Sequence, residues 1–408
     1  MTSLFSRACL FSLFALLALP FPLSAQETDA SAAKPSTSWM FPTTPKPRPD
    51  GGKWRIGYYE SGDYVEYPLT LQAIAEGLQK LGWVKLPPIP EGLSGEALWR
   101  FLAENARGSA LEFVGDAYWK PGNFDEKQRP DTMRSFMDHL KTKHGVDLVI
   151  AMGTWAGQDM ARLGTPIPTV VASTSDPLES GIIESPEDSG QENLHARIHP
   201  GRYGHQVRLF HGIIPFRTLG VVYEDSPEGR TYAAVGTIEE VARERGFEIV
   251  FCHAPFSGVE ISVATQKALE CYRKIAPRVD AIYVTTHRGI TPVSIRQVAD
   301  VLRRAQAPSF SMLGSEEVKA GVLMSLAEAK KSYLGLFHAE VIARIFNGAK
   351  PRQLNQILPD PAKIALNLKT TRLIGFDPPV DLLLATDEVY EAETRERAPE
   401  NPQVQKSE

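Results

Sequence analysis

Short apolar runs alternate with amphipathic stretches along most of the chain. The runs that have the pattern of buried strands cover residues 54–59, 147–153, 168–173, 218–224, 247–252 and 280–286. Stretches with apolar residues three and four positions apart follow most of these runs and predict helices. Strands that are apolar throughout are buried on both faces, so the alternation predicts an α/β fold with parallel sheets covered by helices on both sides.

Hydroxyl, charged and aromatic side chains stand where the expected strands end. In open parallel sheets, ligands bind outside the carboxyl ends of the strands. Hydroxyls and helix N-terminal amides suit a carboxylate, and aromatic walls suit a ring or another apolar group. The candidate ligand-binding residues are Tyr59, Glu60, Thr154, Trp155, Ser173, Thr174, Ser175, Asp176, Glu224, Asp225, Thr285, His287, Arg288 and Ser325. Taken singly, such hydroxyls and carboxylates are also common helix caps and turn formers, so the prediction rests on their convergence.

The two ends of the chain differ in composition from its middle. Residues 1–25 combine Arg7, an apolar run and a small-residue cleavage pattern, which is typical of a secretory signal peptide. Residues 26–52 are rich in Pro, Ser and Thr and predict a disordered tether, and residues 392–408 predict a disordered tail. We therefore expect a periplasmic protein, and the roughly 340 residues between tether and tail predict two lobes.

Charge and motifs argue against several classes of function. The net charge is −5 and no basic stripe is present, which argues against nucleic-acid binding. We find no GxSxG, P-loop, GxGxxG or CxxC motif, so we predict neither an enzyme nor a cofactor. His195, His199, His205 and His211 are close in sequence, but their spacing matches no zinc motif, and solvent-facing or hydrogen-bonded histidines are the simpler interpretation.

Cys252 and Cys271 are the two cysteines that remain after signal cleavage. In an oxidising compartment they can form a disulfide. Sequence separation does not define the distance between their Cα atoms, so two separate half-buried thiols remain the alternative.

Three segments resemble the ABC-transporter substrate-binding family that includes tryptophan- and tyrosine-type binding proteins. They are VDLVIAMGTWAGQDMARLGTPIPTVVASTSDPLESGII, the segment that begins DAIYVTTHRGITPVSIRQ, and KIALNLKTTRLIGFDPPVDLLLATDEVYE. The resemblance runs from about Trp54 to Glu391. It implies a type I periplasmic-binding-protein fold, in which two doubly wound α/β lobes are joined by three crossovers and a hinge closes on the ligand.

The resemblance also implies a division of the chain into lobes. Residues 53–195 and 313–350 would form the first lobe, and residues 196–312 and 351–391 would form the second. Residues 85–130 are longer and more aromatic than the family usually shows, and Tyr118 and Trp119 are interpreted either as part of a lid or as packing residues.

The family's site residues carry over onto particular positions. Its Gly-Thr pair falls on Gly153 and Thr154, its hydroxyl and Asp-Pro turn on 175–177, and its second-lobe loop on 224–232. Where the family often has Asp-Asn, this chain has His287 and Arg288. Bases at these two positions should disfavour an amine there and favour a neutral or acidic ligand group.

The resemblance implies an extracytoplasmic solute-binding protein that delivers a small molecule to an ABC permease in the inner membrane. The expected ligand is a small polar or aromatic metabolite, amino-acid-like or carboxylate-bearing, and the protein is expected to be monomeric. A periplasmic sensor that reports to a membrane receptor or kinase would have the same fold, and it remains the alternative.

Overall fold

The structure, a computed structural model, describes residues 40–122, 124–141, 145–327, 330–359 and 363–391. All of these residues fall within a single compact unit. The expected signal peptide, the first part of the expected tether and the expected tail at residues 392–408 lie outside the described residues. Among the described residues, no helix has the length and apolar character needed to cross a bilayer.

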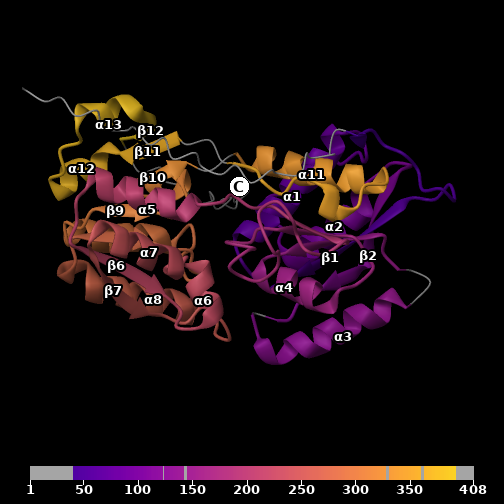
Figure 1. The fold of residues 1–408 in the computed structure, drawn as a ribbon, viewed down its shortest axis with the longest axis horizontal. Helices are drawn as coiled ribbons and strands as arrows, with labels where there is room; N and C mark the ends of the chain where they lie inside the picture. Colours follow the sequence, from indigo (N-terminus) through magenta and orange to yellow (C-terminus); the bar gives the residue numbers. More distant parts are fainter. Residues whose placement is uncertain (1–39, 123, 142–144, 328–329, 360–362, 392–408) are drawn as a thin grey trace, which may run out of the picture. The chain divides into compact units, whose positions relative to one another are not determined.

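The first lobe is built on five parallel strands in the order β2-β1-β3-β4-β5, of which β1 and β2 are labelled in Figure 1. The strands are β1 (Trp54–Glu60), β2 (Leu111–Trp119), β3 (Leu148–Met152), β4 (Thr169–Ala172) and β5 (Leu194–Ala196). One face packs on α1 (Glu66–Lys80), α2 (Gly95–Asn105) and α11 (Lys331–Phe346), and the other on α3 (Arg129–Leu140) and α4 (Thr154–Leu163). Because side chains alternate along a strand, Tyr58 lies in one core and Tyr59 in the other. Tyr118 and Trp119 pack inside this lobe, from β2.

The second lobe is built on seven strands in the order β12-β11-β10-β9-β8-β6-β7. They are β6 (Thr218–Tyr223), β7 (Glu248–His253), β8 (Ala281–Val284), β9 (Ser309–Ser311), β10 (Met324–Ala327), β11 (Lys363–Asn367) and β12 (Thr386–Tyr390). The helices are α5 (Arg202–Ile213), α6 (Pro227–Tyr232), α7 (Val235–Arg245), α8 (Ile261–Ile275), α9 (Ser294–Arg304), α10 (Ser315–Lys319), α12 (Leu368–Ile374) and α13 (Val380–Ala385). Val221 faces the core under α5 and α7, and Val222 faces the core under α8 and α9. One pair, β10 with β11, is antiparallel, where we expected only parallel pairs.

The lobe boundaries differ from the expected ones. Strand β10 pairs with β9 and β11, so residues 313–327 belong to the second lobe and not to the first. Residues 351–357 belong to the first lobe instead of the second, because Ile357 pairs with Ile198 next to β5 and Gln356 accepts a bond from the Ala196 amide. Strand pairing decides lobe membership, and motif similarity does not report it.

Part of the expected disordered tether is attached to the first lobe. The side chain of Trp83 donates to the carbonyl of Thr43, and that of Trp54 donates to the carbonyl of Lys46. Asn347, just after α11, donates to the carbonyls of Pro42 and Thr44. The prediction of disorder is therefore wrong for residues 42–46, because side chains distant in sequence satisfy the carbonyls of this segment.

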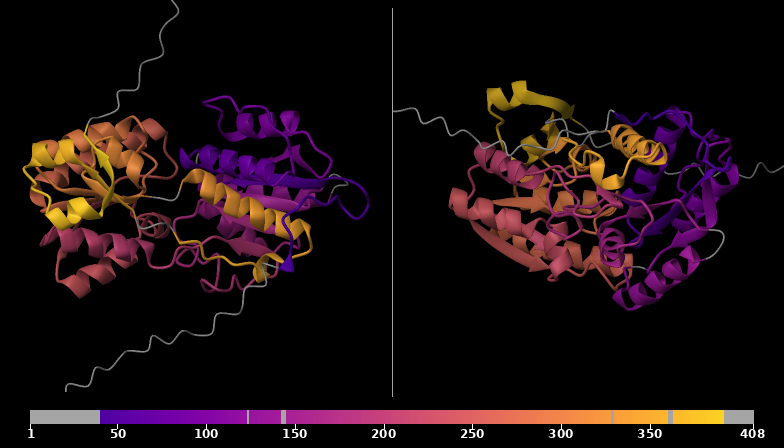
Figure 2. Two further views of the ribbon diagram at one scale, coloured as in Figure 1. Left: turned by 90° about the horizontal axis from the view of Figure 1, so that it is seen from above. Right: turned by 45° about the vertical axis from the view of Figure 1, so that its right-hand side comes forward.

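Helix α11 comes from the last third of the sequence and packs along α1 of the first lobe (Figure 2, left). The two backbones approach closely at Gly335, where an added Cβ would lie 2.2 Å from the carbonyl oxygen of Ala73. Only glycine allows this approach without a shift of one helix.

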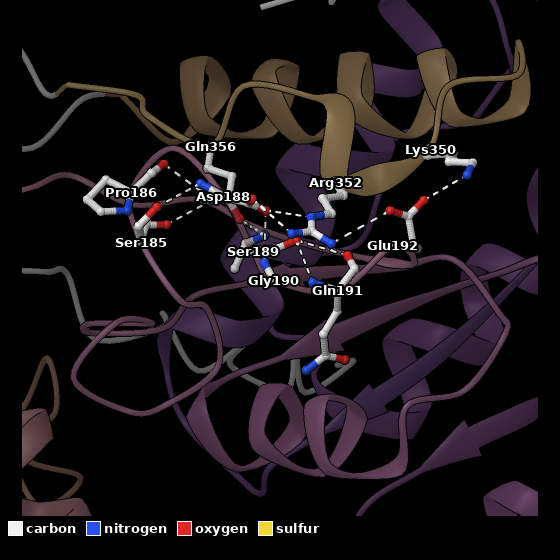
Figure 3. Close-up of polar contacts among 11 residues, drawn as sticks. Ser185, Pro186, Asp188, Ser189, Gly190, Gln191, Glu192, Lys350, Arg352 and Gln356 are labelled. Atoms are coloured by element: carbon white, nitrogen blue, oxygen red, sulfur yellow. Dashed lines mark hydrogen bonds and ion pairs between the residues drawn. The ribbon is translucent and has the colours of Figure 1, made fainter. Parts of the chain in front are cut away.

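A polar network joins the segment after α11 to the loop between β4 and β5 (Figure 3). The Arg352 guanidinium donates to both carboxylate oxygens of Asp188, at 2.7 and 2.9 Å, and Lys350 bonds Glu192 at 2.8 Å. Gln356 donates to the carbonyl of Ser185 at 3.2 Å. The network thus holds residues 350–356 against the first lobe.

Cys252 on β7 and Cys271 on α8 form a disulfide, with their Cα atoms 5.6 Å apart. Of the two alternatives left open by the sequence, the bonded one is therefore the one found. The bond ties the strand to the helix that follows it in the second lobe.

Replacing both cysteines, Cys252→Ser with Cys271→Ser, should lower the free energy of unfolding by about 3 kcal/mol. The reason is that a loop of roughly 20 residues is no longer closed in the unfolded chain. Urea denaturation of both proteins measures the difference. Adding dithiothreitol should lower the free energy of unfolding of the parent protein and leave that of the double variant unchanged. An equal effect of dithiothreitol on both proteins would contradict the prediction.

Candidate functional site

A cavity of about 760 Å³ lies among residues that follow strands of both sheets. Its first-lobe wall comes from the segment before α3 and from the start of α4. Its second-lobe wall comes from the ends of β6 and β7. The lining residues are Phe124, Asp125, Glu126, Lys127, Gln128, Trp155, Glu224, Asp225, Ser226, Glu228, Ser257, Gly258, Val259 and Glu260. The site is thus built where parallel strands end, as the sequence pattern predicts for a ligand-binding crevice.

Aromatic rings from both lobes meet beside this cavity. The ring of Phe124 lies 5.6 Å from that of Trp155 and 5.3 Å from that of Phe256, measured between ring centres. Tyr232, at the end of α6, lies 4.7 Å from Phe256. These edge-to-face and tilted contacts are favourable for aromatic pairs and form an apolar wall.

Arg288, from the second lobe, is a buried cation of this region, with 2% of its surface exposed. Its Nη1 donates to the carbonyls of Phe256 at 3.0 Å and Val259 at 2.8 Å, and its Cζ lies 5.6 Å from the centre of the Phe124 ring. Burial lowers the pKa of the guanidinium, and nearby carboxylates oppose that shift, among them Glu260. The Nε and Nη2 atoms have no hydrogen-bond partner among the described residues.

Two more buried polar atoms near the aromatic wall lack partners in the described part of the chain. They are the indole Nε1 of Trp155 and the hydroxyl of Tyr232. A buried polar group without a partner costs about 1–3 kcal/mol, so such groups are rare without a functional reason. Of these side chains and Arg288, Trp155 lines the cavity, and Arg288 and Tyr232 lie behind the lining residues against Phe124 and Phe256.

The position of Trp155 depends on a buried ion pair. Arg129 lies 4.5 Å from the indole centre and donates to the Trp155 carbonyl at 3.3 Å. Asp159 holds this guanidinium at 2.7 Å and also accepts a bond from the Tyr59 hydroxyl. The side chains of the pair are 8% and 0% exposed, so the interaction is shielded from water.

Carboxylates outnumber cations on the cavity wall. The acidic lining residues are Asp125, Glu126, Glu224, Asp225, Glu228 and Glu260, against the single lining cation Lys127. Glu224 is engaged in the wall itself, because its carboxylate accepts from the amides of Phe256 and Ser257. The other carboxylates add to a negative potential that attracts a cationic group.

Three of the candidate residues from the sequence line the cavity: Trp155, Glu224 and Asp225. Arg288 lies behind them against Phe124. The other candidates do not line the cavity and remain predictions as ligand contacts.

The remaining second-lobe candidates are fully buried and bonded to backbone. The hydroxyl of Thr285 donates to the Val222 carbonyl, and that of Ser325 donates to the Ser311 carbonyl. His287 accepts from the Gly289 amide through Nδ1 at 3.0 Å, so its Nε2 carries the proton and donates to the Ala254 carbonyl. Burial lowers the pKa of His287 to about 4, which keeps the ring neutral at pH 7.

The first-lobe candidates after β4 form a turn. Asp176 accepts from the amides of Leu178 at 2.9 Å and Glu179 at 3.0 Å, which is the turn-organising role that the sequence allowed. Ser173 has a φ of +56°, and the Ser175 carbonyl accepts from the Tyr203 hydroxyl. Thr174 is half-buried in the same turn, and Thr154 is buried at the first position of α4.

Glu60 is a buried carboxyl at the end of β1. Its two oxygens accept from the hydroxyls of Tyr58 at 2.9 Å and Tyr118, and Lys120 lies 4.0 Å away. Burial raises the pKa of Glu60 to about 7, although both tyrosine bonds lower it. The group therefore titrates near neutral pH inside the first lobe.

The histidines of residues 195–211 do not gather in one place. His195 on β5 bonds the Asn355 carbonyl at 2.9 Å in the first lobe, and burial lowers its pKa to about 4. His211 on α5 stacks on Phe247 in the second lobe. In the described ranges, no group of three or more His, Cys, Asp or Glu side chains is placed to hold a metal.

Sequence reasoning did not select Phe124, Tyr232 or Phe256 as site residues. Phe256 follows the end of β7, a strand end that was not considered, and Tyr232 closes the second-lobe loop that the family resemblance had marked. Phe124 lies in the long 85–130 segment, and nothing in its local sequence indicates that it reaches the second lobe.

Comparisons with known proteins agree with this architecture. The family model for ABC transporter substrate binding proteins matches residues 125–389. The chain therefore belongs to this family, and its fold is that of type I periplasmic binding proteins. No curated protein matches the sequence.

Solved structures show the same fold at low sequence identity. A conserved domain protein from Vibrio cholerae is 18% identical with a TM-score of 0.63, over 83% of this chain and 99% of that one. The ABC domain from Streptococcus pneumonia in complex with L-Trp is 20% identical with a TM-score of 0.60, over 82% and 99%. An open, ligand-free substrate-binding protein with adhesive properties from Clostridium difficile is 17% identical with a TM-score of 0.53, over 84% and 100%.

Replacing Asp159 by alanine should lower the free energy of unfolding by about 3–5 kcal/mol, because it leaves Arg129 buried without its counter-charge. Intrinsic tryptophan fluorescence should change as well, since Arg129 lies over Trp155. Urea denaturation followed by fluorescence measures both effects. Asp138→Ala is the control, since its pair with Lys141 is exposed and should contribute almost nothing.

Glu60→Gln should remove one component of the pH dependence of stability. The pKa of Glu60 is raised in the folded state from 4.5 to about 7, so folding favours its protonated form. Below about pH 4.5, protonated Glu60 therefore contributes about 3 kcal/mol to the free energy of unfolding. This contribution is lost as the pH rises through about 7.

The difference between the two proteins isolates this effect. The buried His195, His287 and His338 have lowered pKa values and contribute in the opposite direction, but equally in both proteins. Denaturation curves at several pH values should show the parent protein losing stability relative to Glu60→Gln between pH 4.5 and 7. Parallel profiles would show that Glu60 does not take up a proton in this range.

Proposed function

We propose that this member of the ABC transporter substrate-binding family captures a small zwitterionic, amino-acid-like metabolite and delivers it to an importer. The observation that carries the proposal is the set of unpaired buried donors on Arg288, Trp155 and Tyr232 beside a cavity lined with carboxylates. The donors suit a carboxylate, and the carboxylates suit an ammonium group.

The geometry of Arg288 supports a bidentate carboxylate contact. Its Nη1 is used by the carbonyls of Phe256 and Val259, which leaves the Nε–Nη2 edge of the guanidinium. Two parallel N–H groups on this edge match the two oxygens of a carboxylate. Because the side chain is almost completely buried, such a pair would be little screened by salt.

The acidic wall gives a place for the amine of the same ligand. From the sequence alone, His287 and Arg288 argued against an amine in this region. The low pKa of His287 leaves it neutral at pH 7, so Arg288 is the only cation of this pair. The acidic side chains of the cavity then favour a ligand that carries both signs of charge over a simple anion.

Two further observations support export of the protein. The N-terminal sequence has the pattern of a signal peptide, and the disulfide between Cys252 and Cys271 suits an oxidising compartment. A periplasmic solute-binding protein would deliver its ligand to an ABC permease. Uptake of labelled ligand by cells that lack the protein separates this role from that of a sensor, because only an importer would lose uptake.

A thermal-shift panel tests the ligand class. The panel compares α-amino acids with the corresponding acids that lack the amine and the amines that lack the carboxylate. A ligand at about 100 times its dissociation constant stabilises the protein by about 2.7 kcal/mol, which raises the melting temperature. We expect the amino acids to give the largest shifts, and equal shifts by the simple acids would contradict a zwitterionic ligand.

Tyr232→Phe should weaken binding of the amino acid that emerges from the panel by about tenfold to a hundredfold. The variant removes a hydroxyl that would donate to a charged ligand group, a bond worth about 1.5–3 kcal/mol. It should not destabilise the free protein, because that hydroxyl has no partner among the described residues. Isothermal titration calorimetry and thermal melts measure the two effects.

Tyr272→Phe is the matched control. The Tyr272 hydroxyl is also buried and without a partner in the described part of the chain, but it lies in the core between α8 and the second sheet. The two variants should therefore have similar stabilities and only Tyr232→Phe should lose affinity. Equal affinity in both variants would remove Tyr232 from the proposed site.

A further inference from the structure

The ring of Phe124 lies in the middle of the proposed site. It is 2% exposed and touches Trp155 from its own lobe and Phe256 and Arg288 from the second lobe. The carbonyl of Phe124 accepts from the Gly258 amide at 3.0 Å, which joins the two lobes at this point.

The surrounding chain accommodates this ring. An added Cβ at Gly62 would lie 2.6 Å from the Phe124 ring, so glycine at that position leaves space for it. Phe124 itself has a φ of +56°, a conformation that is uncommon for a residue with a bulky side chain. Unusual backbone conformations persist where the surrounding contacts over-determine them, and they cluster at functional sites.

Phe124 offers no acceptor to the donors that surround it. The face of the ring attracts the Arg288 cation, but the ring has no acceptor atom for the unpaired N–H groups of Arg288 and Trp155 next to it. The ring thus fills the space between the aromatic side chains, and the unpaired N–H groups remain for a polar group of a ligand. Because the ring occupies the space between Trp155 and Phe256, an aromatic side chain of a ligand cannot enter that space.

We infer that Phe124 is a specificity-determining residue whose ring fills the aromatic subsite, so that the protein takes small aliphatic amino acids and excludes aromatic ones. This inference rests on the proposed function, because it concerns the side chain of the same ligand. Removing the ring should open a cavity between Trp155 and Phe256. A buried apolar cavity left by the removal of a large side chain can bind benzene-like molecules.

The experiment compares the parent protein with Phe124→Ala, using L-alanine, L-phenylalanine and indole as probes in calorimetric titrations. The parent protein should bind L-alanine more tightly than L-phenylalanine. Phe124→Ala should bind L-phenylalanine at least tenfold more tightly than the parent does, and it should also acquire measurable binding of indole. Circular dichroism establishes that the variant is folded, and Phe124→Val, with a smaller cavity, replaces it if it is not.

Phe136→Ala is the matched control, because Phe136 is equally buried but packs between Tyr59 and Trp119 inside the first lobe. It should gain no affinity for L-phenylalanine, so a gain in both variants would overturn the inference. Parent protein that already binds L-phenylalanine as tightly as Phe124→Ala would overturn it too, and so would a folded variant that binds no indole.

The outcomes also separate this inference from the proposed function. If Phe124→Ala gains indole while no variant binds any amino acid, the aromatic subsite stands and the zwitterionic ligand is wrong. If the parent protein binds amino acids but Phe124→Ala gains neither probe, the proposed function stands and the role of Phe124 is wrong.

Discussion

The buried guanidinium of Arg288 is the constraint on which the rest of the site depends. Removing a charge from water is costly unless hydrogen bonds and opposite charges compensate. One terminal nitrogen is compensated by the carbonyls of Phe256 and Val259, and this holds the segment after β7 in place. The compensation is incomplete, because Nε and Nη2 have no partner within the described ranges. An anionic ligand group would complete it.

Residues from both lobes position the walls of the cavity near Arg288. The Arg129–Asp159 pair orients Trp155 from the first lobe, and Glu224 bonds the amides of Phe256 and Ser257 from the second. Each interaction positions a wall of the cavity without filling it. The proposed zwitterionic ligand would place its carboxylate near the Arg288 cation behind the wall and its ammonium group near the carboxylates of the wall.

Glu60, at the end of β1 in the first lobe, is also a buried ionisable group, but its hydrogen bonds differ from those of Arg288. Its carboxyl is compensated by two tyrosine hydroxyls and lies away from the cavity wall. A strand-end position therefore does not by itself place a side chain on the cavity wall. The same applies to Thr285 and Ser325, whose hydroxyls satisfy backbone carbonyls inside the second lobe.

The sequence by itself predicted six of the strands, the helices that follow most of them, and the strand ends beside which the candidate cavity lies. Continuous apolar runs can be buried only inside covered sheets, so each of the expected strands is present, and Trp155, Glu224 and Asp225 lie at the cavity as their positions after strands predict. Only the tertiary structure decided that β10 joins the second sheet, that α11 packs on α1, and that Phe124 reaches Arg288. These are contacts between residues far apart in sequence, and local periodicity carries no information about which distant backbones pair or which ring fills a shared space.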